Sequence, residues 1–225
     1  MTTPRLPKVA GIDSPPGQVP PPAHTVAPAP AVAPVPPAPT APGAVIQDRL
    51  AGWVSDLTTL HELTERLART AALDDALHEL LRAGAALMGA RRGLVVMEPG
   101  DGLGPDTTVG LGLSRPDLGH IETVPRGATS YGRILDGLST TPESHADLLA
   151  EDGLDPRHRE VAARLGYAAS YALPLATDGT GRLGAAVWLY DEPAEPVERQ
   201  RHLIGLYTRY ATEHLARLLE LERTR

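Results

Sequence analysis

The most informative stretch of this chain is residues 166–191, which read GYAASYALPLATDGTGRLGAAVWLYD. Apolar runs at 168–176 and 182–190 lie on either side of Asp178-Gly179 and Gly181. An Asp-Gly pair between apolar runs predicts an antiparallel hairpin, because glycine readily adopts the positive φ that tight turns require. Pro174 has no N–H to donate, so we expect it at a sheet edge, at a bulge, or where its N–H would point outward.

The composition excludes several kinds of chemistry. The 225 residues include no cysteine, which rules out disulfides, thiolate nucleophiles, cysteine-ligated zinc, iron–sulfur clusters and thioether-linked chromophores. The formal net charge is -7 and no run of Lys or Arg occurs, so we expect no nucleic acid as a partner. Neither a secretory signal nor an apolar run of about 18 residues occurs, so we expect no membrane span and a cytoplasmic location.

The first part of the chain differs sharply from the rest. Residues 1–43 are rich in proline, alanine, valine and threonine and carry no periodic apolar face. Each proline removes a backbone donor and disfavours helix in the residue before it, so we predict a disordered tail with polyproline II character. Order should begin near Ala44, and residues 44–225 should form one domain.

Helices are expected at both ends of this domain, over 46–67 and 197–223. In the helix expected over 46–67, apolar residues recur at spacings of three and four and form a narrow stripe. Such a stripe suits a seam between helices, either within a dimer or against the C-terminal helix. We therefore expect a homodimer. Its interface residues are predicted to be Leu50, Leu57, Leu206 and Tyr210.

Between these helices, short helical and extended segments follow one another. Residues 70–88 predict a second helix, with an acidic pair near its start and Gly89 as its stop. Extended segments are predicted at 93–98, 106–113, 121–124 and 138–142, and helical ones at 129–136, 145–150 and 156–165. Asp155-Pro156 resembles an N-cap followed by proline at the first helical position. Helices at both ends of an antiparallel sheet indicate an α+β fold.

The later motifs resemble those of the GAF domain family. That family's hairpin reads roughly Ser-x-hydrophobic-x-x-Pro-Leu, a turn, and Gly-x-hydrophobic-Gly followed by hydrophobic residues. Here the corresponding segments are SYALPL (170–175), TDGTG and RLGAAVWL (182–189), and LMGARRGLVVM (87–97) fits the family's entry into the first strand. The resemblance covers about residues 70–220. It implies a GAF/PAS-like antiparallel sheet of about six strands, with a pocket beneath the 127–165 crossover.

The specialised chemistry of that family is not expected here. Its bilin-attaching and methionine sulfoxide-reducing members need cysteine, which this chain lacks. Its cyclic-nucleotide-binding members carry an Asn-Lys, Phe and Asp-Glu signature, and this chain has no phenylalanine. His120, His145 and His158 lie where haem-binding members place a histidine, but loop histidines are typically solvated, so we expect no haem. The sequence leaves any other cofactor unassigned.

No catalytic motif supports an enzymatic function. His61-Glu62 begins like the zinc signature HExxH, but Glu65 stands where the second histidine is needed. The chain also lacks the G-x-S-x-G motif of a nucleophilic serine. The sequence therefore favours a protein that is not an enzyme.

The layout also suggests where a ligand would bind. The candidate pocket residues, on the crossover and the hairpin, are Tyr131, Arg133, His145, Tyr171, Trp188 and Tyr190. Aromatic rings with one Arg and one His would suit a small, partly polar ligand. Strand alternation places Trp188 and Tyr190 on one face of the sheet and Val187 and Leu189 on the other. The alternative is that Trp188 and Tyr171 fill a core otherwise made of small residues.

These observations predict a non-catalytic, GAF-like sensory or regulatory module in signal transduction or transcriptional control. It would bind a small-molecule ligand or an unknown effector protein. Binding would shift the crossover and alter the packing of the terminal helices. The alternative is a structural dimerisation or protein-interaction module with an empty, degenerate pocket.

Overall fold

A computed structural model of the chain describes residues 42–99, 107–178 and 181–224. The predicted disordered tail lies almost entirely outside these residues. So do the tips of the turn predicted after the first strand and of the turn within the hairpin.

The predicted hairpin is present. Strand β4 (Ala169–Thr177) pairs antiparallel with β5 (Gly181–Tyr190), and Gly181 has a φ of 71°, which glycine adopts without steric cost. Pro174 pairs with Ala185 on β5. On the other side of β4, strand β3 (Glu143–His145) reaches only as far as Ala172, so no described strand needs an N–H from Pro174. The proline therefore lies at a sheet edge, as predicted.

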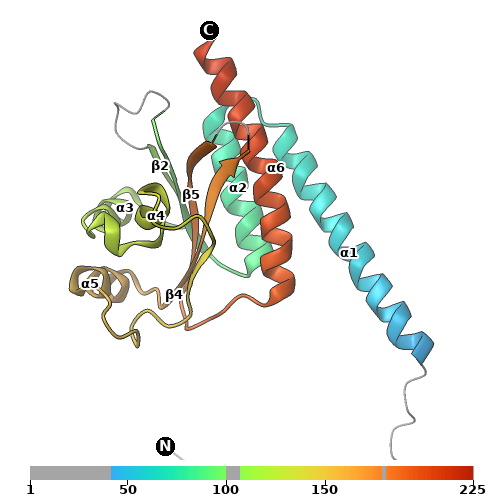
Figure 1. Cartoon of the computed structure of the whole chain (residues 1–225), viewed down its shortest axis with the longest axis horizontal. Helices are drawn as coiled ribbons and strands as arrows, with labels where there is room; N and C mark the ends of the chain where they lie inside the picture. The colour runs from blue at the N-terminus through green and yellow to red at the C-terminus, as the bar shows by residue number, and fades with distance from the viewer. Residues whose placement is uncertain (1–41, 100–106, 179–180, 225) are drawn as a thin grey trace, which may run out of the picture. The chain divides into compact units, whose positions relative to one another are not determined.

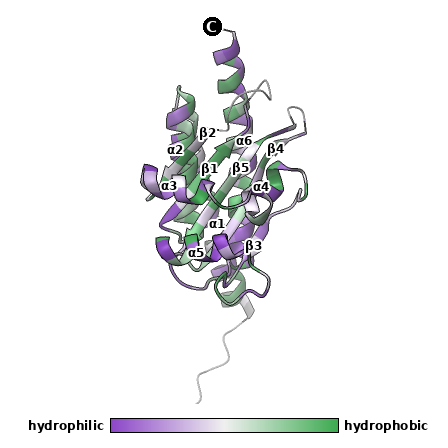
Figure 2. Ribbon diagram, turned by 90° about the vertical axis from the view of Figure 1, so that its left-hand side faces the viewer, coloured by the Kyte–Doolittle hydropathy of each residue, from purple (hydrophilic) through white to green (hydrophobic). Residues whose placement is uncertain are grey.

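The hairpin is part of a five-stranded antiparallel sheet. Strand β1 (Arg92–Met97) lies between β5 and β2 (Thr107–Leu111), which gives the order β2-β1-β5-β4-β3. Strand β1, which has a neighbour on each side, is drawn largely in the hydrophobic colour in Figure 2. Strands with neighbours on both sides and helices on both faces are shielded from water. The predicted α+β fold is confirmed, with five strands in the described residues instead of about six.

The strand predicted at 121–124 is wrong. These residues follow and partly belong to helix α3 (Arg115–Glu122), and Ser114 begins it. The Asp117 N–H donates to Ser114 Oγ at 3.3 Å, and the Ser114 N–H donates to Asp117 Oδ2 at 2.8 Å. This capping box favours a helix, and Ile121 is its buried apolar residue. A short apolar run cannot by itself distinguish a strand from the buried side of a helix.

The predicted helices are present with small differences in their bounds. They are α1 (Pro42–Ala68), α2 (Leu73–Met88), α4 (Ser130–Leu135), α5 (Pro156–Leu165) and α6 (Glu198–Arg223). As predicted, α2 stops at Gly89, which has a φ of 67°, and Asp155 caps α5 by accepting the Arg157 N–H at 2.9 Å. Residues 145–150 are not helical, because His145 ends β3 and a turn follows. Residues 138–142, predicted to be extended, form bends and coil, and the strand β3 begins only at Glu143.

Helices cover both faces of the sheet (Figure 1). Helices α2 and α6 pack on one face, here called the helix face, and α1 packs against them through its C-terminal part. Helices α3, α4 and α5 and the 3-10 turn η1 (Arg126–Ala128) cover the opposite face, here called the crossover face. Among the described segments, no helix is both long and apolar enough to cross a membrane.

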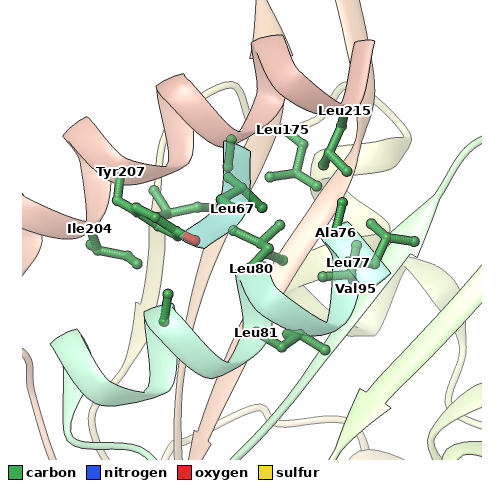
Figure 3. Packing of buried hydrophobic residues seen from close by; sticks show 14 of the residues in the cluster. Leu67, Ala76, Leu77, Leu80, Leu81, Val95, Leu175, Ile204, Tyr207 and Leu215 are labelled. Atoms are coloured by element: carbon green, nitrogen blue, oxygen red, sulfur yellow. The ribbon is translucent and has the colours of Figure 1, made fainter. Parts of the chain in front are cut away.

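The core beneath the helix face is made mainly of leucine side chains (Figure 3). Leu67, Leu80 and Leu215, from α1, α2 and α6, are fully buried there. Trp188 of β5 is also fully buried, and its indole lies against the backbone of α2 at Gly84. A Cβ atom at residue 84 would stand 2.1 Å from the Trp188 ring, so the ring can pack there only because residue 84 is glycine.

Candidate functional site

The crossover face holds a small cavity between the sheet and the crossover helices. Its volume is about 20 Å³, room for about one water molecule. Its apolar wall consists of Leu94, Ile121, Val124, Val187 and Leu189. Its polar and aromatic wall consists of Thr129, Ser130, Tyr131, His158, Tyr167 and Ser170. Pockets for small ligands typically have volumes of about 300–1,000 Å³, so this cavity is nearly filled by the protein itself.

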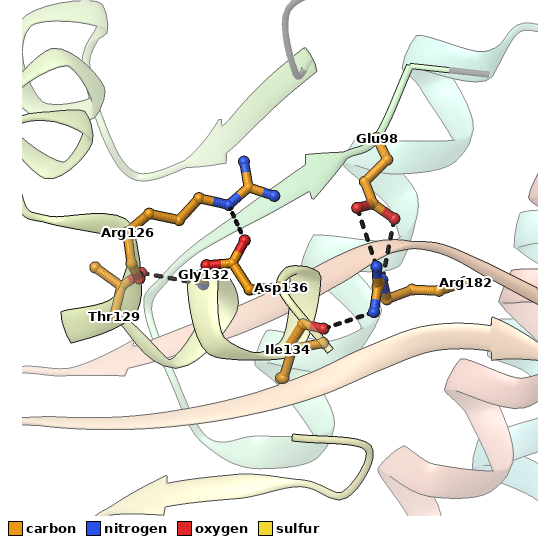
Figure 4. Close-up of polar contacts among 7 residues, drawn as sticks. All are labelled: Glu98, Arg126, Thr129, Gly132, Ile134, Asp136 and Arg182. Atoms are coloured by element: carbon orange, nitrogen blue, oxygen red, sulfur yellow. Dashed lines mark hydrogen bonds and ion pairs between the residues drawn. The ribbon is translucent and has the colours of Figure 1, made fainter. Parts of the chain in front are cut away.

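Helix α4, which covers the cavity, is attached to its surroundings at two points (Figure 4). Arg126, which precedes the helix, donates through Nε to Oδ1 of Asp136, which follows the helix, at 2.8 Å. At its end, Arg182 of β5 donates through Nη1 to the Ile134 carbonyl at 3.0 Å. The same guanidinium donates through Nε to Glu98 Oε2, also at 3.0 Å. These contacts fix the backbone of α4 relative to β1 and β5.

The start of α4 is held closely against η1. Thr129 is its N-cap, and Thr129 Oγ1 accepts the Gly132 N–H at 3.0 Å, which satisfies one of the free donors of the first turn. A Cβ atom at residue 132 would lie 1.9 Å from the Arg126 carbonyl oxygen, so only glycine permits this approach. The neighbouring Ser130 and Tyr131 are thereby placed at the cavity wall.

His158 of α5 is the buried histidine of the cavity wall. Its Nδ1 lies 3.0 Å from the Ala128 carbonyl oxygen. Since a carbonyl can only accept, Nδ1 carries the proton, and in the neutral ring Nε2 is then an acceptor. Burial lowers the pKa of His158, although the bond to Ala128 partly opposes this. The ring is therefore neutral near pH 7 and presents a hydrogen-bond acceptor.

Two tyrosines adjoin this histidine. The ring centroid of Tyr167 lies 6.3 Å from that of His158. Burial raises the pKa of Tyr167 strongly, and the nearby Tyr131 raises it further, so the Tyr167 phenol stays protonated at physiological pH. Within the described residues, no cluster of three or more His, Asp or Glu side chains could hold a metal ion. The wall thus offers neutral hydrogen-bonding groups and no charge.

The six predicted pocket residues do not converge on this cavity. Only Tyr131 lines it. Tyr171, Trp188 and Tyr190 lie on the helix face, where the Trp188 Nε1–H donates to the Leu81 carbonyl at 3.2 Å. The Tyr190 hydroxyl likewise donates to the Met88 carbonyl at 3.2 Å. This placement supports the alternative that Tyr171 and Trp188 fill the core.

The other two predicted residues form ion pairs near the surface. Arg133 Nε lies 3.3 Å from Glu143 Oε1, and His145 Nδ1 lies 2.7 Å from Glu151 Oε2. Neither residue lines the cavity. Arg133 links α4 to β3, and His145 joins β3 to the turn that follows it.

Sequence reasoning missed His158, Tyr167 and Ser170 as pocket residues. His158 was considered only as a haem ligand, and Ser170 only as a fold motif. Strand alternation could have found Ser170, because it precedes Tyr171 and therefore faces the other side of the sheet. The missing information was which face carries the cavity.

A second hollow region lies between α1 and α6. It has a volume of about 650 Å³ and is bordered by Trp53, Leu57 and Leu60 of α1 and by Leu203 and Leu206 of α6. Beside it, Arg199 Nε donates to Asp56 Oδ2 at 2.8 Å, and this bond lowers the pKa of Asp56. The groove is therefore mainly apolar, but Arg49, Glu198 and His202 also line it, and the Asp56–Arg199 ion pair joins the two helices.

The four residues predicted for a dimer interface are all exposed on these two helices. Leu50 and Leu57 are 54% and 65% exposed, and Leu206 and Tyr210 are 38% and 36% exposed. Leu57 and Leu206 border the groove. In all, α1 exposes six large apolar side chains: Val45, Ile46, Leu50, Trp53, Val54 and Leu57.

Comparison with known proteins identifies the family. A profile of the GAF domain matches residues 72–221. No curated protein sequence matches the chain. The fold is similar to the GAF domain of a phosphoenolpyruvate-protein phosphotransferase from Acinetobacter, with 13% identity over 75% of this chain and 98% of that one and a TM-score of 0.59.

Two further solved domains are similar at the level of fold. The GAF domain of a Coxiella burnetii phosphoenolpyruvate-protein phosphotransferase has 18% identity over 75% of this chain and 96% of that one, with a TM-score of 0.59. That of a putative sensor histidine kinase from Pseudomonas syringae pv. tomato has 17% identity over 80% and 97%, with a TM-score of 0.55. The chain belongs to the GAF domain family, whose members are sensory and regulatory modules.

Proposed function

We propose that this chain is a non-catalytic regulatory module that works by docking a second copy of itself through α1 and α6. The observation that carries the proposal is the exposed apolar stripe of α1. Trp53 and Leu57 are 67% and 65% exposed, although large apolar side chains usually cluster on a surface only where something covers them.

The spacing within this stripe favours a second copy as the covering partner. Ile46, Leu50, Trp53, Leu57 and Leu60 follow one another at intervals of four, three, four and three residues. This is the heptad spacing with which like helices pair side by side in coiled coils. The stripe continues seven residues on to Leu67, which is already fully buried against α2 and α6. The N-terminal half of α1 thus carries a packing seam without a partner in the described chain.

Sedimentation equilibrium tests this proposal. The wild-type chain should be a dimer at micromolar concentration. The double variant Leu50→Glu, Leu57→Glu should weaken association at least about a hundredfold, because burying each leucine contributes about 1.5–3 kcal/mol. Ser55→Glu is the matched control, since Ser55 is exposed on the opposite side of α1. A wild-type monomer, or an unchanged dimer in the double variant, would refute the proposal.

A second candidate function is favoured by the cavity on the crossover face. Its buried histidine, serine and tyrosine side chains are typical of a site that recognises a small molecule, and they lie beneath the crossover, which would shift when a ligand enters. Native mass spectrometry of the purified chain would detect a bound molecule. If the mass always equals that of the polypeptide, the structural dimerisation module with an empty pocket becomes the better account.

A further inference from the structure

Two hollows adjoin each other on the crossover face. The inner one is the cavity of about 20 Å³ next to His158 and Ser170. The outer one has a volume of about 330 Å³ and contains Val96 and Leu118 in its wall. The residues that line both hollows are Leu94, Ile121, Val124 and Tyr131. The two hollows are therefore separated by side chains that they share.

The inner hollow has hydrogen-bonding capacity that the protein leaves unused. Within the described residues, neither His158 Nε2 nor the Ser170 hydroxyl has a hydrogen-bond partner, although both side chains are buried. Nε2 can accept one hydrogen bond, and the serine hydroxyl can donate one. Buried polar groups normally have partners, so this pair suits the head of a bound molecule or a water that holds its place.

The outer hollow has a different character. Its wall combines the apolar side chains of Leu94, Val96, Leu118, Ile121 and Val124 with polar ones, and its charged residues are Glu122 and Arg126, of which Arg126 is already paired with Asp136. At about 330 Å³ it falls at the lower end of the range for small-molecule sites. It would therefore hold the apolar body of a small molecule.

Tyr131 is the shared side chain best suited to move. Leu94 lies on β1, which is paired on both sides, and Ile121 and Val124 are almost fully buried, whereas Tyr131 is only half-buried. The backbone beneath it is tied down by Arg182 and by the Thr129 cap. Opening a path between the hollows thus needs first a rotation of the Tyr131 side chain, and the crossover would shift only as the ligand fills the site.

We propose that the two hollows form one ligand site for a neutral, amphipathic small molecule, with Tyr131 as the gate between its compartments. The polar head would donate to His158 Nε2 and accept from Ser170, and the apolar body would fill the outer hollow. This inference rests on the ligand-sensing candidate above and is independent of docking through α1.

The lining explains why the ligand is neutral. Among the described residues that line the inner hollow none is Asp, Glu, Lys or Arg, and His158 is uncharged near pH 7 because burial lowers its pKa. A charged head would lose its hydration without gaining a counter-charge, which is costly in a buried site. A primary amide, which carries both a donor and an acceptor, fits the His158–Ser170 pair.

Linear primary amides from butanamide to octanamide are suitable probes, with binding followed by ¹H–¹⁵N NMR titration of the full chain. Affinity should rise by about fourfold for each added methylene, which corresponds to about 0.8 kcal/mol per buried CH₂. The amide signals of Tyr131, His158 and Ser170 should shift. Octanoate should bind at least about tenfold more weakly than octanamide. Shifts confined to the α1–α6 groove, or affinity independent of chain length, would overturn the proposal.

Substitutions at the gate and at the head site complete the test. Tyr131→Ala should tighten octanamide binding by about tenfold, because the path between the two hollows is then open without a rotation of the Tyr131 side chain. His158→Gln should weaken it by about tenfold, since the carboxamide cannot reproduce both roles of the ring. Leu221→Ala, at an exposed leucine near the end of α6, is the control and should leave binding unchanged.

Tyr131→Leu serves if the alanine variant does not fold, and it should also tighten binding. Equal affinity in the wild type and in the folded gate variant would overturn the gate. If the amides do not bind, native mass spectrometry of the purified chain distinguishes a wrong ligand class from the absence of any ligand. A co-purified molecule of another chemistry that shifts the same signals would retain the ligand-sensing function and reject the amphipathic class.

Discussion

The helix face and the crossover face of the sheet differ in how completely they are filled. On the helix face, Trp188 packs directly on the α2 backbone among the leucines of three helices. On the crossover face, the neighbouring Leu189 borders a cavity whose wall carries buried polar groups. The same strands thus carry a tightly packed core on one face and a small cavity with polar side chains in its wall on the other.

Substitutions of Trp188 and Leu189, which are adjacent on β5, should show the largest effect of this difference in packing. Trp188→Ala should lower the free energy of unfolding by about 4 kcal/mol, because a tightly packed site cannot collapse onto the space left behind. Leu189→Ala should cost about 2–3 kcal/mol, since its surroundings already contain a cavity. Urea denaturation followed by circular dichroism gives both values. Equal losses at the two positions would show that the two faces are packed alike.

A pair of glycine substitutions should give the next largest effect. Gly84→Ala would place a methyl group on the Trp188 ring, so we expect a loss of about 2–3 kcal/mol in the free energy of unfolding. Gly119→Ala, in α3 on the crossover face, meets nothing within 4 Å. It should be neutral or stabilise by up to about 1 kcal/mol, because alanine favours helix. Thermal and urea unfolding compare the two. If Gly84→Ala is as stable as the wild type, the Trp188 indole does not pack closely against the backbone of residue 84.

The smallest expected effect is a pH dependence that arises on the crossover face. Burial lowers the pKa of His158 in the folded chain, so the unfolded chain binds more protons as the pH falls below about 6.5. The stability that neutral His158 contributes is therefore complete above that pH and is lost on acidification towards its folded pKa.

Unfolding free energies at about pH 7.5 and about pH 5.5 test this sign. The decrease in the free energy of unfolding from the higher to the lower pH should be smaller in His158→Gln than in the wild type. His214 on the helix side also has a pKa lowered by burial, so only the difference between the two proteins isolates His158. An identical decrease in both would contradict the burial of a neutral His158.

Sequence patterns were sufficient for most of the fold and insufficient for the site. Asp178-Gly179, Gly89 and Asp155 mark their turn and helix ends through local chemistry, which acts over a few residues. Residues 121–124 were assigned to the wrong element because four apolar residues fit a strand and a buried helix side equally well.

The cavity depends on contacts between distant parts of the chain. Alternation correctly separated Trp188 from Leu189, but it carries no information on which helices cover each face. That choice depends on Gly84 meeting Trp188 and on Arg182 meeting the Ile134 carbonyl, and these pairs are far apart in sequence.

Cysteine cross-linking tests docking through the α1 stripe most directly, because the natural chain has no cysteine. Leu50→Cys and Leu57→Cys each place one thiol in the stripe, and Ser55→Cys places one on the opposite side of the same helix. Under mild oxidation, we expect rapid covalent dimers from the first two and only slow, concentration-dependent dimers from the third. Equal cross-linking at all three positions, or none within the stripe, would contradict the account.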